Sequence, residues 1–227
     1  MAELVYALGL GSSEATHEGS SPFIDTMDFK IRQYCNDPFN TCRLYDPAIF
    51  ECPYAEDINP GLMEWIKSNV IPQPSNDAST TSFKPTKIGL PIKELKVLFD
   101  WINSVSVESS EMLARGTGTA YHSAPPEYKN FEVADYWGMW YNEGDFAEEH
   151  NHFPYSMSFA YYVNCPEGSS PLVLEGNEIQ VTEGRLIMFA GHQNHKVDPC
   201  PVNNRFMIAG NIAYLGFVDD NAGVVQR

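Results

Sequence analysis

Apolar residues recur at three- and four-residue intervals between Ile92 and Val105. This spacing predicts an amphipathic helix whose apolar stripe must be buried. A shorter helix is predicted from Asn59 to Val70, with Asn59 as the N-cap and Pro60 at the first helical position. We expect both helices to pack on one outer face of a sheet.

From Phe131 onward the pattern changes to short runs of β-branched and aromatic residues, separated by turn-forming residues. Eight strands are expected: Phe131–Tyr141, His150–His152, Ser156–Asn164, Leu172–Leu174, Glu178–Thr182, Arg185–Ala190, His195–Asp198 and Arg205–Tyr214. Short strands at this spacing predict a jelly roll of two sheets, so the fold class is mainly β with flanking helices. We expect one structural domain, with 131–227 as its β core and 1–130 as an N-terminal extension whose helices pack on the barrel.

Composition narrows the classes of partner. The 227 residues are 43% hydrophobic and 13% aromatic, which is enough to bury a core and argues against a disordered chain. The formal net charge of −16, without a basic patch, disfavours nucleic acid and anionic membranes as partners. No apolar run approaches the roughly 18 residues of a membrane span, and no signal peptide is recognised. Five cysteines without a CxxC pair are typical of reduced thiols in the cytoplasm.

Four of the six histidines fall close together in the predicted β core, at positions 150, 152, 192 and 195. Residues i and i+2 of a strand share a face, so His150 and His152 are expected to project two imidazoles together. A third imidazole, from His192 or His195, follows the strand Arg185–Ala190. Three such groups suit divalent iron, zinc, copper or nickel.

Arg205 opens an apolar strand ten residues after His195. A buried guanidinium without a partner is costly, so Arg205 is expected to face an anion, and its planar fork suits a carboxylate. That anion is either an internal Asp or Glu or the carboxylate of a ligand.

Six segments within about 131–215 resemble the iron(II)- and 2-oxoglutarate-dependent oxygenases, in particular a hydroxylase branch that is similar to prolyl hydroxylases and common in bacteria and marine phages. The segments are Trp140–Asp145, His150–Pro154, Ser158–Asn164, Gly184–Phe189, His195–Pro199 and Arg205–Asn211. The resemblance implies a double-stranded β-helix, which is a cupin-like jelly roll. It also implies Fe(II), 2-oxoglutarate and O2, with ascorbate as a further candidate cofactor, and hydroxylation of a C–H bond through a ferryl intermediate. The substrate would be a protein side chain or a small molecule.

The same resemblance assigns roles to individual residues. His150 and His195 correspond to the two iron histidines, and Arg205 to the arginine that pairs with the distal carboxylate of 2-oxoglutarate. Tyr162 would donate a hydrogen bond to that same carboxylate. Asn211 shares the inward face of its strand with Arg205 by alternation, so it is also expected near the cosubstrate.

Two positions depart from the family pattern. His152 stands where the family normally has a carboxylate, so the expected metal ligands are three histidines, with His152 beside the metal as the alternative. Glu148 or Glu149 could supply the third ligand instead. Met207 stands where many members have a serine that helps the arginine to hold the cosubstrate.

Two other functions remain open at this point. One is a cupin-type dioxygenase that uses three histidines and no oxo acid. The other is a non-catalytic jelly-roll structural protein whose histidines bind a metal adventitiously. Whichever of the three functions applies, we expect the protein in the cytoplasm, either of a bacterium or of the host of a phage.

Overall fold

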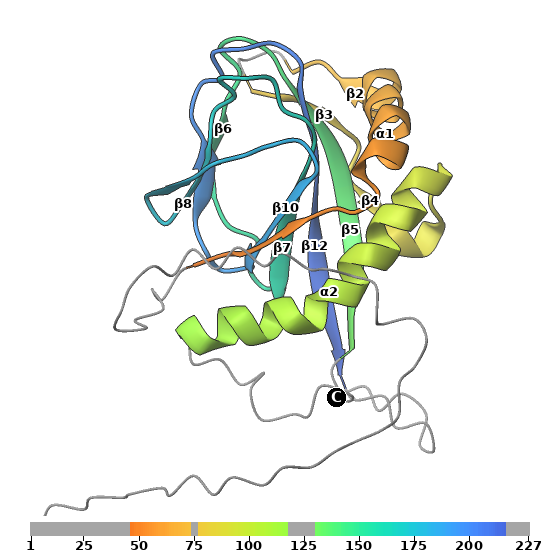
Figure 1. The fold of residues 1–227 in the computed structure, drawn as a ribbon, viewed down its shortest axis with the longest axis vertical. Coiled ribbons are helices and arrows are strands. Elements are labelled where there is room, and N and C mark those ends of the chain that lie inside the picture. Colours follow the sequence, from red (N-terminus) through yellow and green to blue (C-terminus); the bar gives the residue numbers. More distant parts are fainter. Residues whose placement is uncertain (1–45, 74–76, 118–129, 217–227) are drawn as a thin grey trace, which may run out of the picture. The chain divides into compact units, whose positions relative to one another are not determined.

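The chain forms twelve strands in the computed structural model, which describes residues 46–73, 77–117 and 130–216 (Figure 1). The strands are β1 Ala48–Glu51, β2 Val70–Ile71, β3 Ser79–Thr81, β4 Lys84–Pro85, β5 Asn130–Tyr141, β6 Ala147–His150, β7 Met157–Asn164, β8 Leu172–Leu174, β9 Asn177–Ile179, β10 Arg185–Ala190, β11 His195–Val197 and β12 Arg205–Gly216. The larger sheet has the order β1-β10-β7-β12-β5-β3-β2, with β4 paired to β5, and the smaller sheet has the order β6-β11-β8-β9. These two antiparallel sheets confirm the predicted jelly roll.

Helix α1, Ala55–Asn69, begins four residues before the predicted N-cap. Asn59 therefore lies inside the helix and does not cap it. Its side-chain oxygen accepts a hydrogen bond from the Tyr161 hydroxyl at 2.7 Å, and its amide nitrogen donates to Glu183 at 3.2 Å. These tertiary bonds use the groups that would otherwise cap the helix, which is why the prediction from local sequence was wrong.

Helix α2, Lys93–Thr117, extends well beyond the predicted end at Val105. The serines that interrupt the apolar pattern are accommodated because their hydroxyls bond within the helix. Ser106 donates to the carbonyl oxygen of Ile102 at 2.7 Å, and Ser109 donates to that of Val105 at 2.9 Å. A short 3₁₀ helix, η1 Thr86–Ile88, precedes α2.

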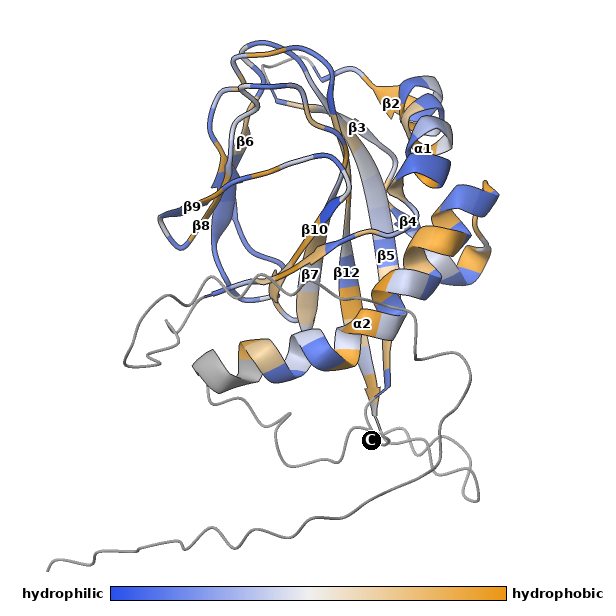
Figure 2. Cartoon of the chain, in the orientation of Figure 1, coloured by the Kyte–Doolittle hydropathy of each residue, from blue (hydrophilic) through white to orange (hydrophobic). Residues whose placement is uncertain are grey.

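Two hydrophobic clusters lie on opposite faces of the large sheet. The first joins that sheet to α1 and α2, and it includes the stripe that predicted the second helix: Leu95, Leu98, Phe99, Ile102 and Val105. The second lies between the large and small sheets, with side chains from β5, β7, β8, β10, β11 and β12. Figure 1 shows α1 and α2 on one side of the large sheet and β6 and β8 on the other, and Figure 2 shows the hydrophobic residues of α2. Side chains of α1 and α2 thus pack on one face of the large sheet.

Four short strands come from a region in which no strand was predicted. β1 adds to one edge of the large sheet beside β10, and β2, β3 and β4 lie beyond or beside β5. Two to four residues are too few to show a period-two pattern, so sequence could not reveal these strands. Residues 1–45 of the predicted extension lie outside the described residues, and the division at residue 130 stays a prediction.

A β-bulge interrupts the pairing of β5 with β12. Asn211 pairs with Asp135 and Ile212 pairs with Val133, so Ala134 has no opposite residue. The Thr86 hydroxyl binds at the bulge, 2.7 Å from the carbonyl oxygen of Val133 and 3.1 Å from that of Ala134. Because a bulge reverses the alternation of faces, Val133 points into the first cluster and Asp135 points to the other face.

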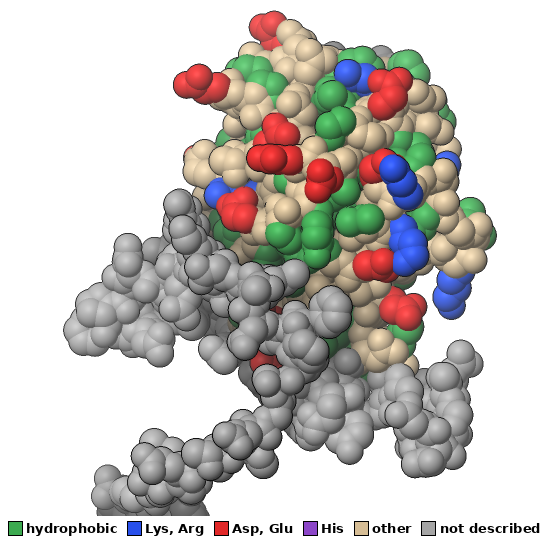
Figure 3. Space-filling model, turned by 45° about the vertical axis from the view of Figure 1, so that its right-hand side comes forward, with side chains coloured by type: hydrophobic (Ala, Val, Ile, Leu, Met, Phe, Trp, Pro, Cys, Tyr) green, Lys and Arg blue, Asp and Glu red, His purple; other side chains and the backbone are tan. Residues whose placement is uncertain are grey.

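The face turned forward in Figure 3 carries acidic and basic side chains interspersed with apolar ones, and the basic groups form no continuous patch there. Neither of the two described α-helices is long and apolar enough to cross a membrane.

We expect the first cluster to dominate the stability of the fold. Leu98, fully buried where α2 meets the sheet, should lose about 2–5 kcal/mol of unfolding free energy when replaced by Ala, because the cavity cannot fully collapse. Val97→Ala, at a neighbouring position on α2 that is 38% exposed, should cost about 0.5 kcal/mol. Urea denaturation measures both, and equal losses would contradict this packing.

Candidate metal centre and anion pocket

Three histidines meet where β6 and β11 pair. His150 ends β6 and lies directly opposite His195, which begins β11. His152 does not lie on a strand as predicted, because β6 ends at His150; it lies in the following turn, where its backbone N–H donates to the carbonyl oxygen of Gly191 at 2.7 Å. One ring nitrogen from each of the three imidazoles lies within 4.8 Å of the others.

The backbone orients two of these rings. Nδ1 of His150 lies 2.7 Å from the carbonyl oxygen of Glu148, and Nδ1 of His195 lies 3.2 Å from that of Gln193. A ring that donates through Nδ1 keeps its lone pair on Nε2, which is the usual arrangement of a metal-binding histidine. Nε2 of His152 lies 3.3 Å from Nε2 of His195, so these nitrogens converge on one point.

Burial keeps two of the imidazoles neutral. It lowers the pKa of His195 to about 3, and the charge of His150 acts in the same direction. Burial and His150 likewise lower the pKa of His152 to about 4, against a side-chain hydrogen bond with Asn211 that raises it. Neutral imidazoles have a free lone pair, so the cluster is prepared for a cation at neutral pH.

Aromatic side chains pack against the imidazoles of His152 and His195. Trp137 stacks on His152, with 5.5 Å between ring centroids and 11° between planes, and Phe189 lies 4.6 Å from the ring of His195. Phe83, which is exposed, stacks in turn on Trp137 at 5.2 Å. Sequence reasoning missed Phe83, because nothing local to it in the sequence signals this contact.

The other candidate ligands lie outside the cluster. Glu148 and Glu149 are exposed on β6, and neither belongs to the cluster of His150, His152 and His195. His192 is also exposed and is not part of the group, whereas His195 is.

Arg205 is fully buried, and among the described residues none of its three guanidinium nitrogens has a hydrogen-bond partner. Its guanidinium carbon lies 4.5 Å from the ring centroid of Tyr141 and 5.2 Å from that of Tyr162. The Tyr162 hydroxyl is buried and also has no hydrogen-bond partner in the described part of the chain. The internal Asp or Glu considered from the sequence is thus not found there, and the unpaired donors fit a carboxylate.

Tyr141 is a pocket residue whose role the sequence did not reveal. It pairs directly with Arg205 across β5 and β12, and the positive charge of Arg205 lowers its pKa against the larger, opposite effect of burial. Only the strand register puts them together, and register cannot be read from either strand alone. Met207, the second departure, pairs with Tyr162 and is buried in the second cluster.

The histidines and the arginine face the same interior. Val197, two residues after His195 on β11, and Met207, two residues after Arg205 on β12, both belong to the cluster between the sheets. Since alternate residues of a strand share a face, the imidazole and the guanidinium point into that space from opposite sheets. Asn211 lies on the same face as Arg205, but its side chain bonds to Ser158 and Asp135 and interacts with His152, and its predicted role toward a cosubstrate stays a prediction.

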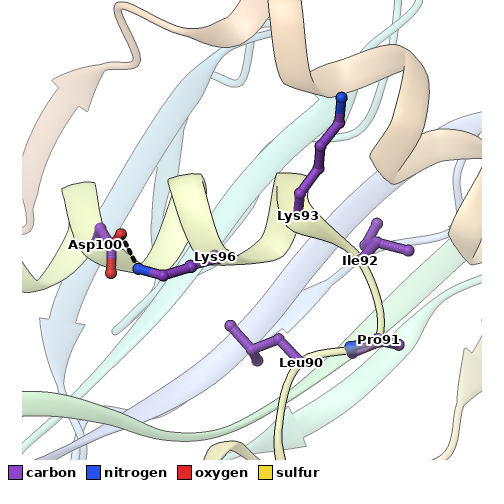
Figure 4. Close-up of a pocket in the computed structure, with 6 residues that line it drawn as sticks. All are labelled: Leu90, Pro91, Ile92, Lys93, Lys96 and Asp100. Carbon is purple, nitrogen blue, oxygen red and sulfur yellow. Dashed lines mark hydrogen bonds and ion pairs between the residues drawn. The ribbon is translucent and has the colours of Figure 1, made fainter.

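A surface hollow at the start of α2 contains none of these residues. It is lined by Leu90, Pro91, Ile92, Lys93, Lys96 and Asp100, with an ion pair of 2.6 Å between the last two (Figure 4).

Solved structures supply the comparison at this point, because no protein-family profile and no curated protein sequence matches the chain. A viral collagen prolyl hydroxylase from Paramecium bursaria Chlorella virus-1, in complex with 2-oxoglutarate, matches with a TM-score of 0.51 at 13% identity, over 75% of this chain and 95% of that one. The non-heme α-ketoglutarate-dependent epimerase SnoN of nogalamycin biosynthesis matches with a TM-score of 0.50 at 9% identity, over 80% and 85%. A Pseudomonas putida prolyl-4-hydroxylase gives 0.49 at 13% identity, over 74% and 92%.

The chain has the jelly-roll fold of these oxygenases. At such low identity, the first two matches establish a likeness in fold alone. This likeness confirms the fold that the sequence resemblance predicted. The histidine cluster and the arginine pocket are separate observations, made on this chain alone.

The burial of His195 predicts an acid titration far from the ordinary one. In the metal-free protein its ring should stay neutral at pH 5, because its pKa is lowered from 6.5 to about 3. The unfolded chain takes up this proton first, so the stability that the neutral ring contributes is present above about pH 6.5 and is lost as pH falls toward 3. Ring-proton NMR against pH measures the titration, and a midpoint near 6.5 in the folded state would contradict the burial.

Proposed function

We propose that the protein is an Fe(II)- and 2-oxoglutarate-dependent oxygenase that hydroxylates a protein side chain or a small molecule. The observation that carries this proposal is the buried, unpaired guanidinium of Arg205, which faces the same inter-sheet space as the histidine cluster. A histidine cluster alone would suit several metals and several chemistries. A cation buried without a partner adds a specific demand for an anionic ligand.

Three neutral imidazoles, from His150, His152 and His195, would hold the metal. Imidazole ligands would leave an Fe(II) ion with its full double charge, which would suit a dianionic ligand better than a neutral one. Iron bound there supplies the activation of O2, and 2-oxoglutarate supplies two electrons through its decarboxylation.

Arg205 would bind the far carboxylate of 2-oxoglutarate through its planar fork, and Tyr162 would donate a further hydrogen bond. The rings of Tyr141 and Tyr162 cover the guanidinium and exclude water, so the charge–charge attraction is weakly screened. The chain would thereby hold one end of the cosubstrate in the interior, on the face that His195 shares.

The substrate would approach from the solvent side of the metal, where His150 is exposed. Glu148 and Glu149, on the same strand as His150, are exposed carboxylates, which favours a basic or neutral substrate over a polyanion. A requirement for ascorbate and a cytoplasmic location stay predictions.

Replacing Arg205 should abolish binding of the cosubstrate. Arg205→Gln removes two charge-assisted hydrogen bonds at about 1.5–3 kcal/mol each, so 2-oxoglutarate affinity should fall about 100-fold or more. Anaerobic titration of the Fe(II) protein with 2-oxoglutarate, followed by the weak visible charge-transfer band, measures it. Arg185→Lys is the matched control, because Arg185 is also buried but is already paired with Glu51 at 2.7 Å.

This control should give the band of the unchanged protein. If Fe(II) binds but no variant and no wild-type sample responds to 2-oxoglutarate, the proposal is wrong and a three-histidine dioxygenase without an oxo acid replaces it. If neither Fe(II) nor 2-oxoglutarate binds, the chain is a non-catalytic jelly roll.

Replacing His195 should weaken Fe(II) binding, whereas replacing the neighbouring His192 should not. His195→Ala removes one of the three converging ring nitrogens and should weaken Fe(II) binding about 100-fold or more, since a metal ligand contributes at least as much as the groups that orient it. His192→Ala should leave Fe(II) affinity unchanged, because His192 is exposed and outside the cluster. Anaerobic equilibrium dialysis of Fe(II) compares them, and equal affinities would refute the site.

A further inference from the structure

Asp135 is a buried carboxylate, only 4% exposed, on β5 beside the metal centre. One of its oxygens accepts a hydrogen bond from the Tyr155 hydroxyl, and the other accepts one from the Asn211 amide at 2.7 Å. No Lys, Arg or His in the described part of the chain forms an ion pair with it. A buried carboxylate held by two neutral donors is costly, and the hydrophobic packing of β5 does not require it.

The backbone is bent to place this carboxylate where it is. The bulge at Ala134 turns Asp135 away from the first cluster, onto the face that also carries Trp137. Trp137 stacks on the imidazole of His152. Thr86 holds the bulge through its hydrogen bonds to two successive carbonyl groups. Bulges that re-aim one side chain in this way are typical of functional sites.

Both partners of Asp135 lead to His152. Tyr155 closes the turn that carries His152, since its backbone N–H donates to the His152 carbonyl oxygen at 3.0 Å. The hydrogen bond to Asp135 raises the pKa of Tyr155 to about 12, so its hydroxyl keeps the proton that it donates. Asn211 receives a hydrogen bond from Ser158 at 2.9 Å and interacts with the His152 side chain.

We propose that Asp135 is a positioning residue for the third metal ligand: its carboxylate fixes Tyr155 and Asn211, and these two residues fix the turn and the ring of His152. The carboxylate of Asp135 also places a negative charge behind the imidazole of His152, with Asn211 between them. His152 stands where the family that the sequence resembles normally has a carboxylate ligand. A carboxylate behind a ligating histidine orients the ring and raises its basicity, and here the connection runs through an amide. This inference rests on the proposed function, because it requires the histidines to bind a metal.

The test is a double-mutant cycle on metal affinity. The full-length protein is titrated with Co(II), as a spectroscopic substitute for Fe(II), and the variant Asp135→Asn keeps the shape of the side chain while removing its charge. We expect Co(II) affinity to fall about 10- to 100-fold, the usual effect of removing a group that orients a ligand. The paramagnetically shifted ring signal of His152 should move, and those of His150 and His195 should not.

The cycle separates positioning from a general loss of structure. In a His152→Ala background, Asp135→Asn should cost less than about twofold, because the ligand on which it acts is gone. In a His150→Ala background the full loss should remain. An equal loss in both backgrounds, or Co(II) binding within about twofold of wild type for Asp135→Asn, would overturn the proposal.

Two further variants complete the design. Tyr155→Phe removes one of the two hydrogen bonds while leaving the charge, and it should show a smaller loss of Co(II) affinity that again requires His152; it decides the question if Asp135→Asn does not fold. Asp100→Asn, on the exposed side of α2, should bind Co(II) like wild type. If wild type itself binds no Co(II), the proposed function fails; if wild type binds and Asp135→Asn is unaffected, only this inference fails.

Discussion

Burial of the Arg205 guanidinium between two sheets is the constraint on which the interpretation of this molecule depends. A buried cation whose three guanidinium nitrogens have no hydrogen-bond partner among the described residues would destabilise a fold that had no use for it. Two tyrosine rings compensate part of that cost through cation–π contacts, at 4.5 and 5.2 Å. No described residue supplies a hydrogen-bond acceptor within reach of the guanidinium, so the pocket is complementary to an anion.

The two faces of the large sheet have separate tasks. The face under α1 and α2 is filled by apolar side chains and carries the larger of the two hydrophobic clusters. It allows the opposite face to carry two groups that are poor for stability, the buried carboxylate of Asp135 and the buried guanidinium of Arg205. The bulge at Ala134 lies at the boundary, because it transfers Asp135 from one face to the other. Stability and chemistry are thus divided by the alternation of strand residues.

Sequence was sufficient where a local pattern determines the structure. Leu172–Leu174 and Arg185–Ala190 were predicted with the bounds that β8 and β10 have, since uninterrupted apolar runs between turn residues leave few alternatives. Prediction from sequence failed where a residue distant in the chain determines the role of a side chain. Asn59 bonds to Tyr161 across the fold. Tyr141 and Asp135 join the site only through the register between β5 and β12. The three histidines and Arg205 were recognisable because their residue types and spacing are unusual; what they contact was not.

The central claim is that Arg205 and the three histidines hold the two ends of one dianion. A crystal structure of the protein grown without oxygen, with Fe(II) and 2-oxoglutarate, tests it most directly. The account predicts iron bound by His150, His152 and His195, with the 2-oxo acid end of the ligand on the metal and its far carboxylate within about 3 Å of the guanidinium. Density for 2-oxoglutarate that leaves Arg205 unpaired, or iron bound elsewhere, would contradict it.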